Sequence, residues 1–145
     1  MNHRWLLVGL VGAMGVVRAG QTDNPYGACA HISRHGEYEV RVQTYRRMGE
    51  IGLGWTRSDF DWRTIQREAG KWDFTMFDNT VGDAEKGNIQ ILPILCSPPP
   101  FAYPAHEHLD QWSGYVRELV KHFGKRLPVV EVWNEPNISP FWKNP

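Results

Sequence analysis

Short apolar runs alternate with longer stretches of helical periodicity along most of this chain, and this pattern constrains its fold more than any other feature. The apolar runs cover residues 27–32, 55–60, 89–95 and 129–133. Between the runs, apolar residues recur every three or four positions, as on the buried face of a helix. These residues are Tyr38, Val42, Tyr45, Met48 and Ile51, then Phe74, Phe77, Val81 and Ala84, then Leu109, Trp112, Val116, Leu119 and Phe123. Strands that alternate with helices in this way predict repeated βαβ units, so we expect a parallel sheet of sequential strands.

Two α/β architectures repeat this unit, an open doubly wound sheet and an eight-stranded βα barrel, and periodicity does not separate them. A doubly wound sheet that binds nucleotides carries a glycine-rich loop after its first strand. This chain has His31-Ile32-Ser33-Arg34 at that place. This difference argues against a nucleotide-binding sheet, and both an open sheet of another kind and half of a βα barrel remain possible on the pattern alone.

Pro93 and the two cysteines lie inside the apolar runs. Because proline cannot donate a ladder hydrogen bond, we expect a bend or bulge at Pro93. Cys29 and Cys96 would lie two strand spacings apart, about 9.5 Å, which is beyond the reach of a disulfide. We expect two buried free thiols. No set of His, Cys or carboxylate residues has a metal-ligand spacing, so we predict no metal and no cofactor.

The first nineteen residues have the order of a secretory signal peptide. Arg4 precedes the uncharged, largely apolar run from Trp5 to Val17, and Ala19 provides the small residue that cleavage requires. Spanning a bilayer takes about twenty apolar residues, so a permanent membrane anchor is the weaker alternative. We expect residues 1–19 to be removed, leaving residues 20–145 as one partial domain of a secreted or periplasmic protein without a membrane partner.

Charge and aromatic content indicate a neutral partner. The chain has 16 basic and 16 acidic side chains, so no long-range field would gather nucleic acid. It has seven tryptophans, and the face of a tryptophan packs well against the C–H face of a sugar ring. Core packing is the alternative explanation for each single tryptophan.

The fourth apolar run ends at Trp133-Asn134-Glu135-Pro136-Asn137, which places a carboxylic acid where barrel enzymes place catalytic groups. Cleavage of a glycosidic bond needs a carboxylic acid that protonates the departing oxygen and then, as a carboxylate, activates water. Glu135 could perform both steps. The alternative is that Asn134 and Glu135 only begin a turn before Pro136.

Residues 130–137, V-E-V-W-N-E-P-N, resemble the fourth strand of the clan A glycoside hydrolases. The resemblance implies that Glu135 is the acid/base of a retaining glycosidase and that Asn134 binds the sugar 2-hydroxyl. Residues 54–62 resemble the clan's second strand, in which an arginine steadies the nucleophile, and this implies that role for Arg57. The alternative for Arg57 is a salt bridge with Asp59 or Asp61.

Further segments are similar to families 39 and 5 of this clan, namely Trp72-Asp73-Phe74, Phe77-Asp78 and residues 97–102. Beyond Glu135, we expect Trp142 to be a platform for a sugar, with simple packing as the alternative. We also expect His31, in a loop after the first strand, to bind a sugar hydroxyl, with a structural role as the alternative.

The resemblance extends from about residue 26 to residue 142 and covers the clan's first four strands. It implies an α/β fold that is the N-terminal half of a (β/α)8 TIM barrel, truncated after about four βα units. In the clan the nucleophile is a glutamate that ends strand seven, which is not among these residues. Asp59 and Asp61 are poor substitutes, because a retaining mechanism needs its two carboxyl groups about 5 to 5.5 Å apart. We therefore expect a partial catalytic domain for an oligo- or polysaccharide that is inactive by itself, and self-association through open sheet edges. The alternative function is a non-catalytic, carbohydrate-binding half barrel.

Overall fold

The computed structural model describes residues 24–34, 36–138 and 142. In this part of the chain, one parallel sheet has four strands in the sequential order β1-β2-β3-β4. The strands are β1 Gly27–Cys29, β2 Trp55–Asp61, β3 Gln90–Cys96 and β4 Glu131–Val132. The predicted α/β fold with sequential parallel strands is confirmed. The signal peptide expected at residues 1–19 lies outside the described residues.

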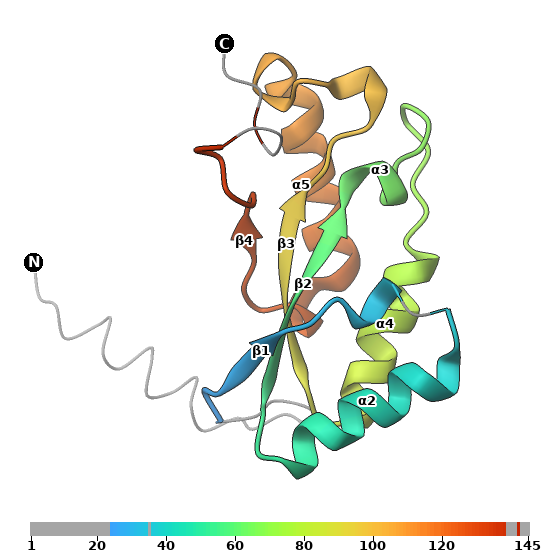
Figure 1. The fold of residues 1–145 in the computed structure, drawn as a ribbon. Coiled ribbons are helices and arrows are strands. Elements are labelled where there is room, and N and C mark those ends of the chain that lie inside the picture. The colour runs from blue at the N-terminus through green and yellow to red at the C-terminus, as the bar shows by residue number, and fades with distance from the viewer. Residues whose placement is uncertain (1–23, 35, 139–141, 143–145) are drawn as a thin grey trace, which may run out of the picture.

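Helices connect the strands and cover one side of the sheet (Figure 1). The α-helices are α2 Tyr38–Glu50, α3 Trp62–Ile65, α4 Thr75–Lys86 and α5 Leu109–Phe123. The short 3-10 helices are η1 Ile32–Arg34, η2 Pro100–Ala102, η3 Ala105–Glu107 and η4 Gly124–Arg126. Each main crossover therefore passes over the same face, as in a section of a βα barrel.

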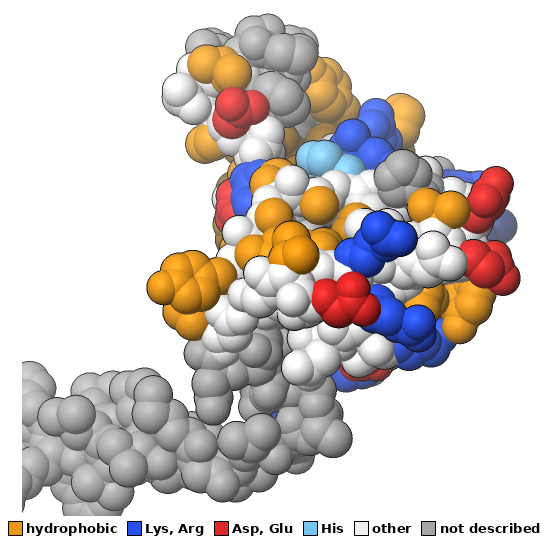
Figure 2. Space-filling model, turned by 60° about the horizontal axis from the view of Figure 1, so that its bottom comes forward, with side chains coloured by type: hydrophobic (Ala, Val, Ile, Leu, Met, Phe, Trp, Pro, Cys, Tyr) orange, Lys and Arg blue, Asp and Glu red, His pale blue; other side chains and the backbone are white. Residues whose placement is uncertain are grey.

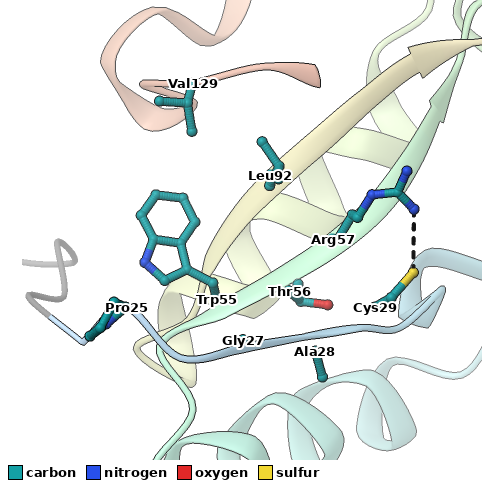
Figure 3. Close-up of a pocket in the computed structure, with 9 residues that line it drawn as sticks. All are labelled: Pro25, Gly27, Ala28, Cys29, Trp55, Thr56, Arg57, Leu92 and Val129. Carbon is teal, nitrogen blue, oxygen red and sulfur yellow. Dashed lines mark hydrogen bonds between the residues drawn. The ribbon is translucent and has the colours of Figure 1, made fainter. Parts of the chain in front are cut away.

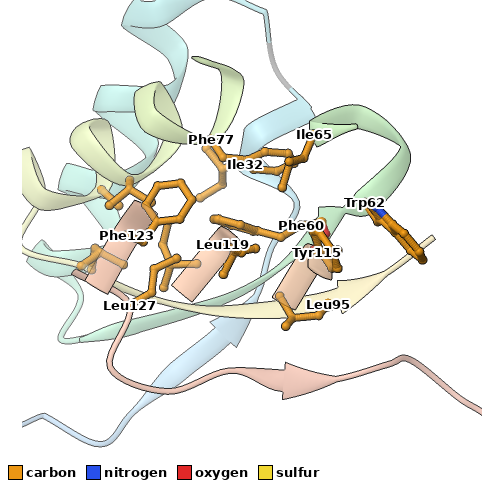
Figure 4. Close-up of a cluster of buried hydrophobic side chains, with 14 of the residues drawn as sticks. Ile32, Phe60, Trp62, Ile65, Phe77, Leu95, Tyr115, Leu119, Phe123 and Leu127 are labelled. Carbon is orange, nitrogen blue, oxygen red and sulfur yellow. The ribbon is translucent and has the colours of Figure 1, made fainter. Parts of the chain in front are cut away.

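The residues of β2 alternate between the two faces of the sheet. Thr56, Ser58 and Phe60 are fully buried, whereas the residues between them are half-buried. Phe60 and Leu95 pack with the helical side chains of Phe77, Leu119 and Phe123 in a continuous apolar core (Figure 4). The sheet thus has one face sealed by helices and one open face, and the open face carries Arg57, Asp59 and Asp61.

Pro93 causes no bulge, so the prediction is wrong in that part, and the predicted bend stays a prediction. β3 pairs with β2 residue by residue from Gln90 to Cys96, with Pro93 opposite Ser58. The backbone of Leu95 points toward β4, since its carbonyl accepts from Trp133 N. Pro93, two residues earlier, points the same way, but β4 pairing begins only at Ile94. The missing N–H therefore removes no ladder hydrogen bond.

Both cysteines are free, as predicted, but only Cys96 is buried. Cys29 is exposed, because it lies on edge strand β1 and faces the open side of the sheet, where no helix covers it. The prediction of two buried thiols is therefore wrong for Cys29.

Gly87, just after α4, lies where α2 and α4 approach each other closely. A Cβ atom at Gly87 would lie 2.7 Å from both the carbonyl carbon and the Cβ atom of Tyr45. Tyr45 is fully buried on α2, so its backbone has little freedom to move away. Gly87 therefore sets how closely the two crossover helices approach.

None of the described helices combines the length and apolar character that crossing a membrane requires. Within the same described residues, no cluster of three or more His, Cys, Asp or Glu side chains is arranged to hold a metal ion. Acidic and basic side chains are interspersed over the surface seen in Figure 2.

Candidate active site

The chain turns sharply just after β4, at the predicted acid. Trp133 and Glu135 have positive φ angles of 67° and 46°, a backbone region that residues other than glycine seldom adopt. Trp133 is held there by a hydrogen bond from its N–H to Leu95 O and by edge-on contacts with two other tryptophans. Its ring centroid lies 5.5 Å from that of Trp112 and 4.8 Å from that of Trp142. Such non-glycine positive φ values cluster at functional sites, where surrounding packing maintains the strain.

A continuous chain of hydrogen bonds joins β2 to the end of β4. Arg57 binds both carboxylate oxygens of Glu131, through Nε at 2.7 Å and Nη2 at 2.6 Å. The same Nη2 donates to Oδ1 of Asn134 at 3.0 Å, and Nδ2 of Asn134 donates to Oε2 of Glu135 at 3.0 Å. The structure therefore brings together Arg57, Asn134 and Glu135, three of the predicted site residues.

The structure defines the position and the salt bridge of Arg57. Arg57 is the third of seven residues in β2, and it reaches the site by the length of its side chain. Its salt-bridge partner is Glu131, not Asp59 or Asp61. The hydrogen bond from Arg57 holds the pKa of Glu131 below its usual range, and the same bond raises the pKa of Arg57.

Sequence reasoning missed Glu131, although a signal was present. Paired residues of neighbouring strands have their side chains on the same face of a sheet, and this rule locates Glu131. Its pairing partner Ile94 is in turn opposite Asp59 of β2. A strand-by-strand register would have placed an unpaired carboxylate next to the face that carries Arg57.

A cavity of about 330 Å³ lies at the carboxyl ends of β2, β3 and β4. Its charged lining residues are Arg34, Asp59, Asp61 and Arg63, and Trp133 and Asn134 form another part of its wall. Two acids and two bases balance the charge of this cavity. Sequence reasoning considered Asp59 and Asp61 as salt-bridge partners of Arg57 and as poor replacements for a nucleophile, and it missed them as cavity residues.

His31 faces Asp59 rather than this cavity. Its Nδ1 lies 3.4 Å from Oδ2 of Asp59, and Arg34 binds the same oxygen. The side chain of His31 is 36% exposed, so it can still be reached from solvent. The sugar-binding role of His31 stays a prediction.

Trp142 packs against its neighbours, which agrees with the alternative that the sequence left open. Besides the edge-on contact with Trp133, its ring centroid lies 5.4 Å from the ring of His106. Trp142 is only half-buried, so part of its surface remains available. Its role as a sugar platform stays a prediction.

Glu135 itself is exposed at the edge of the sheet. An acid that must keep its proton benefits from burial, and the described residues do not supply that burial. The thiol of Cys96 also lines the cavity, and burial raises its pKa to about 12, which disfavours the reactive thiolate.

A second cavity, of about 560 Å³, occupies the open face nearer the amino ends of the strands (Figure 3). Trp55, Leu92 and Val129 give it an apolar lining. Arg57 and Cys29 line the end of this cavity that is nearer the carboxyl ends of the strands, with Nη1 of Arg57 3.6 Å from the sulfur of Cys29. In a closed βα barrel this face would be the packed interior.

Two solved structures that share this fold are described as glycosidases. A family 39 glycoside hydrolase from Bacteroides cellulosilyticus WH2 matches with a TM-score of 0.69 and 23% identity. The match covers 84% of this chain and 26% of that one. A β-glycosidase from Pyrococcus horikoshii matches with a TM-score of 0.58 and 19% identity, over 74% of this chain and 30% of that one. At these identities the likeness shows the fold, and the chain spans about a quarter of the length of the family 39 enzyme.

The sequence gives a family assignment. No curated protein matches the chain in a sequence comparison. The family model described as "Beta-galactosidase", glycoside hydrolase family 42, matches residues 31–128, which is more than half of the chain. The expected membership of clan A is confirmed, and the chain belongs to glycoside hydrolase family 42.

Proposed function

We propose that this chain supplies the acid/base side of the active site of a retaining glycosidase. The observation that carries the proposal is the hydrogen-bonded series Arg57, Asn134 and Glu135 at the carboxyl edge of a parallel sheet. Barrel enzymes place their catalytic groups at this edge. Family membership supports hydrolysis of glycosidic bonds in general, and the roles of single residues given below belong to the proposal.

Glu135 is the proton donor in this mechanism. Asn134 donates to Oε2, which leaves Oε1 to carry the proton that passes to the departing glycosidic oxygen. In the second step the resulting carboxylate takes a proton from water as that water attacks the glycosyl-enzyme intermediate. A substrate bound over the site would provide the burial that keeps Glu135 protonated beforehand.

Asn134 positions both the acid and the sugar. Its Oδ1 accepts from Arg57, so the amide NH₂ points the other way, and one of its two N–H groups is directed at Glu135. The second N–H is available for the 2-hydroxyl of the sugar. A hydrogen bond to this hydroxyl strengthens in the transition state, which makes it useful for catalysis rather than only for binding.

Arg57 orients Asn134 and contributes positive charge. Nε and Nη2 are occupied by Glu131 and Asn134, whereas Nη1 has only a weak thiol contact with Cys29. Figure 3 shows the guanidinium reaching over the open face of the sheet. A carboxylate nucleophile on a later strand would meet Nη1 there and would be held in its ionised form.

The substrate is proposed to be a neutral β-glycoside within an oligo- or polysaccharide. The balanced charge of the cavity at the strand ends supports a neutral sugar, and the description of the matching family makes a β-galactoside the first candidate.

A carbohydrate-binding half barrel without catalysis is the second candidate. The exposure of Glu135 favours it, because a binding site has no need for a protonated acid. The two candidates differ in what Glu135→Gln does. In both candidates the substitution should leave the affinity for the sugar unchanged. Only in a glycosidase should it also abolish a hydrolytic activity that the parent protein has.

The test joins residues 24–142 to strands five to eight of the family 39 enzyme from Bacteroides cellulosilyticus WH2, a fusion here named the completed barrel. We expect it to hydrolyse a β-galactoside with retention of configuration. Glu135→Gln should lower kcat by about a hundred- to ten-thousand-fold, the usual contribution of a general acid. Exposed Glu50 at the end of α2 provides the matched control Glu50→Gln, which should leave kcat unchanged. A completed barrel that folds and hydrolyses equally well after the Glu135→Gln substitution would refute the proposal.

A further inference from the structure

The cavity at the carboxyl ends of β2 to β4 is lined by a carboxylate that makes few hydrogen bonds with the described residues. Asp61 lines this cavity, and its one hydrogen bond among the described residues is a long contact of 3.8 Å from the thiol of Cys96. A thiol is a weak donor, so both oxygens of Asp61 retain most of their capacity to accept. Asp59, by contrast, is already bound by Arg34 and approached by His31.

Asp61 also lacks the hydrogen bond that its position in the chain usually provides. Asp61 is the N-cap residue of α3, where an aspartate ordinarily accepts from the first backbone amides of the helix. It makes no such bond. The carboxylate of Asp61 therefore does not cap α3, and it lines the cavity instead.

Arg63 provides a donor on the same wall. Its side chain is exposed and lines the cavity, and the described residues offer its guanidinium no partner. Trp62, between the two charged residues, is fully buried and stacks on Tyr115 at 5.4 Å. The backbone N–H of Arg63 also donates to Ser97 O. The buried side chain of Trp62 and this backbone hydrogen bond therefore hold in place the turn that carries Asp61 and Arg63.

We infer, on the basis of the proposed function, that Asp61 and Arg63 bind a ring hydroxyl of the sugar unit in this cavity and select neutral sugars. A hydroxyl can donate to the carboxylate and accept from the guanidinium, and hydrogen bonds with one charged partner are the strong ones. Asn134, on the wall formed by β4, holds the 2-hydroxyl. The pair on β2 and α3 reaches a hydroxyl on another carbon of the same ring.

The size and charge of the cavity define the ligand class. A volume of 330 Å³ is near the lower limit of ligand pockets and suits one sugar unit. The lining has two acidic and two basic side chains, so a uronic acid finds no net positive charge. Asp61 would in addition repel its carboxylate.

The test is a titration of the ¹⁵N-labelled chain, followed by NMR, with methyl β-D-galactopyranoside and with methyl β-D-glucuronide. The parent chain should bind the neutral glycoside more tightly, with the largest shifts at the amides of Ser97 and Asn134. Asp61→Asn and Arg63→Gln should each weaken neutral binding by about tenfold, the usual effect of losing a charged hydrogen bond. Glu50→Gln, which removes the same charge at the other end of the molecule, should bind like the parent.

Arg63→Gln changes an exposed side chain, so it tests the inference even if Asp61→Asn fails to fold. The inference is overturned by unchanged affinity in both variants, by preference for the glucuronide, or by no binding of either glycoside. Glu135→Gln separates this inference from the proposed function, because that variant should keep the binding and its selectivity. The two can fail separately. If Asp61→Asn weakens binding of the neutral glycoside but Glu135→Gln leaves the activity of the completed barrel unchanged, the inference is retained and the hydrolytic mechanism is refuted.

Discussion

Arg57 and Asn134 are 77 positions apart in the sequence, yet Nη2 of Arg57 donates to Oδ1 of Asn134 at 3.0 Å. This contact links strand β2 to the turn after β4 and passes over β3, which lies between them. It also fixes which side of the Asn134 amide faces Glu135. The orientation of the proposed acid therefore depends on a residue in a different βα unit.

The Arg57–Glu131 pair should make the stability of the fold depend on acidic pH. Arg57 lowers the pKa of Glu131 from its ordinary value of 4.5 in the folded state. A lowered carboxyl pKa stabilises the fold above the unfolded-state value, and this contribution is lost as pH falls through the folded-state value. Both side chains are about one-third exposed, so the contribution should be about 1 kcal/mol or less.

Urea unfolding at several pH values below 7 measures this effect. Glu131→Gln should reduce the loss of stability below pH 4.5, whereas Glu50→Gln should preserve it. The same acid-side slope in the parent and in Glu131→Gln would show that the pair does not contribute.

Gly87→Ala should destabilise the fold by about 1–3 kcal/mol, as overpacking commonly does. The new methyl group would lie 2.7 Å from the backbone of Tyr45, and neither α2 nor α4 can move away without losing packing contacts. Gly114, inside α5, is the matched control, because nothing lies within 4 Å of a Cβ atom there. Gly114→Ala should stabilise the fold by about 0.5–1 kcal/mol through helix propensity. Thermal unfolding of the two variants decides, and equal effects would contradict the close approach of α2 and α4.

Much of this fold could be predicted from the sequence, because periodicity reports which residues are buried. The three long helices and the strands β2 and β3 follow the apolar pattern closely, whereas β1 and β4 are shorter than the predicted runs 27–32 and 129–133. The pattern did not reveal that Pro93 leaves the pairing of the sheet intact, since that depends on where β4 begins to pair. It also did not reveal the exposure of Cys29, since an apolar strand can lie at the edge of a sheet whose open face nothing covers.

The candidate site was predicted in part. Glu135 and Asn134 were identifiable because a motif of adjacent residues carries them, and Arg57 because its strand resembles a known one. Glu131 and the role of Asp61 were not, because each depends on strand register and on partners far away in the sequence.

Removal of residues 1–19 on secretion is expected from the order of Arg4, the apolar run and Ala19. Mass spectrometry of exported protein should give the mass of a chain that begins at Gly20. Ala19→Arg should block cleavage, because the site requires a small residue at that place. An intact Met1 on the exported parent chain, or retention of the chain in the membrane, would contradict this expectation.

Self-association is expected through the open edge of the sheet. Val132, on edge strand β4, is 66% exposed, and unpaired edge strands invite pairing with another chain. Val132→Lys should reduce association in sedimentation velocity experiments, since a charge protects an edge. Ile51, just after α2, is 76% exposed but belongs to no strand, so Ile51→Lys is the control. A parent chain that remains monomeric at every concentration would exclude this mode of association.

The central claim is that Glu135 donates a proton to the departing oxygen, and the dependence of the rate on the leaving group tests it most directly. The measurement compares kcat/KM of the completed barrel and its Glu135→Ala variant on a series of β-galactosides. An acidic leaving group needs little protonation, whereas an alkyl or sugar leaving group needs it most. We predict a small loss for dinitrophenyl galactoside and a loss of about a hundred- to ten-thousand-fold for a disaccharide. An equal loss on every substrate, or no loss on the disaccharide, would contradict the assignment of Glu135 as the acid.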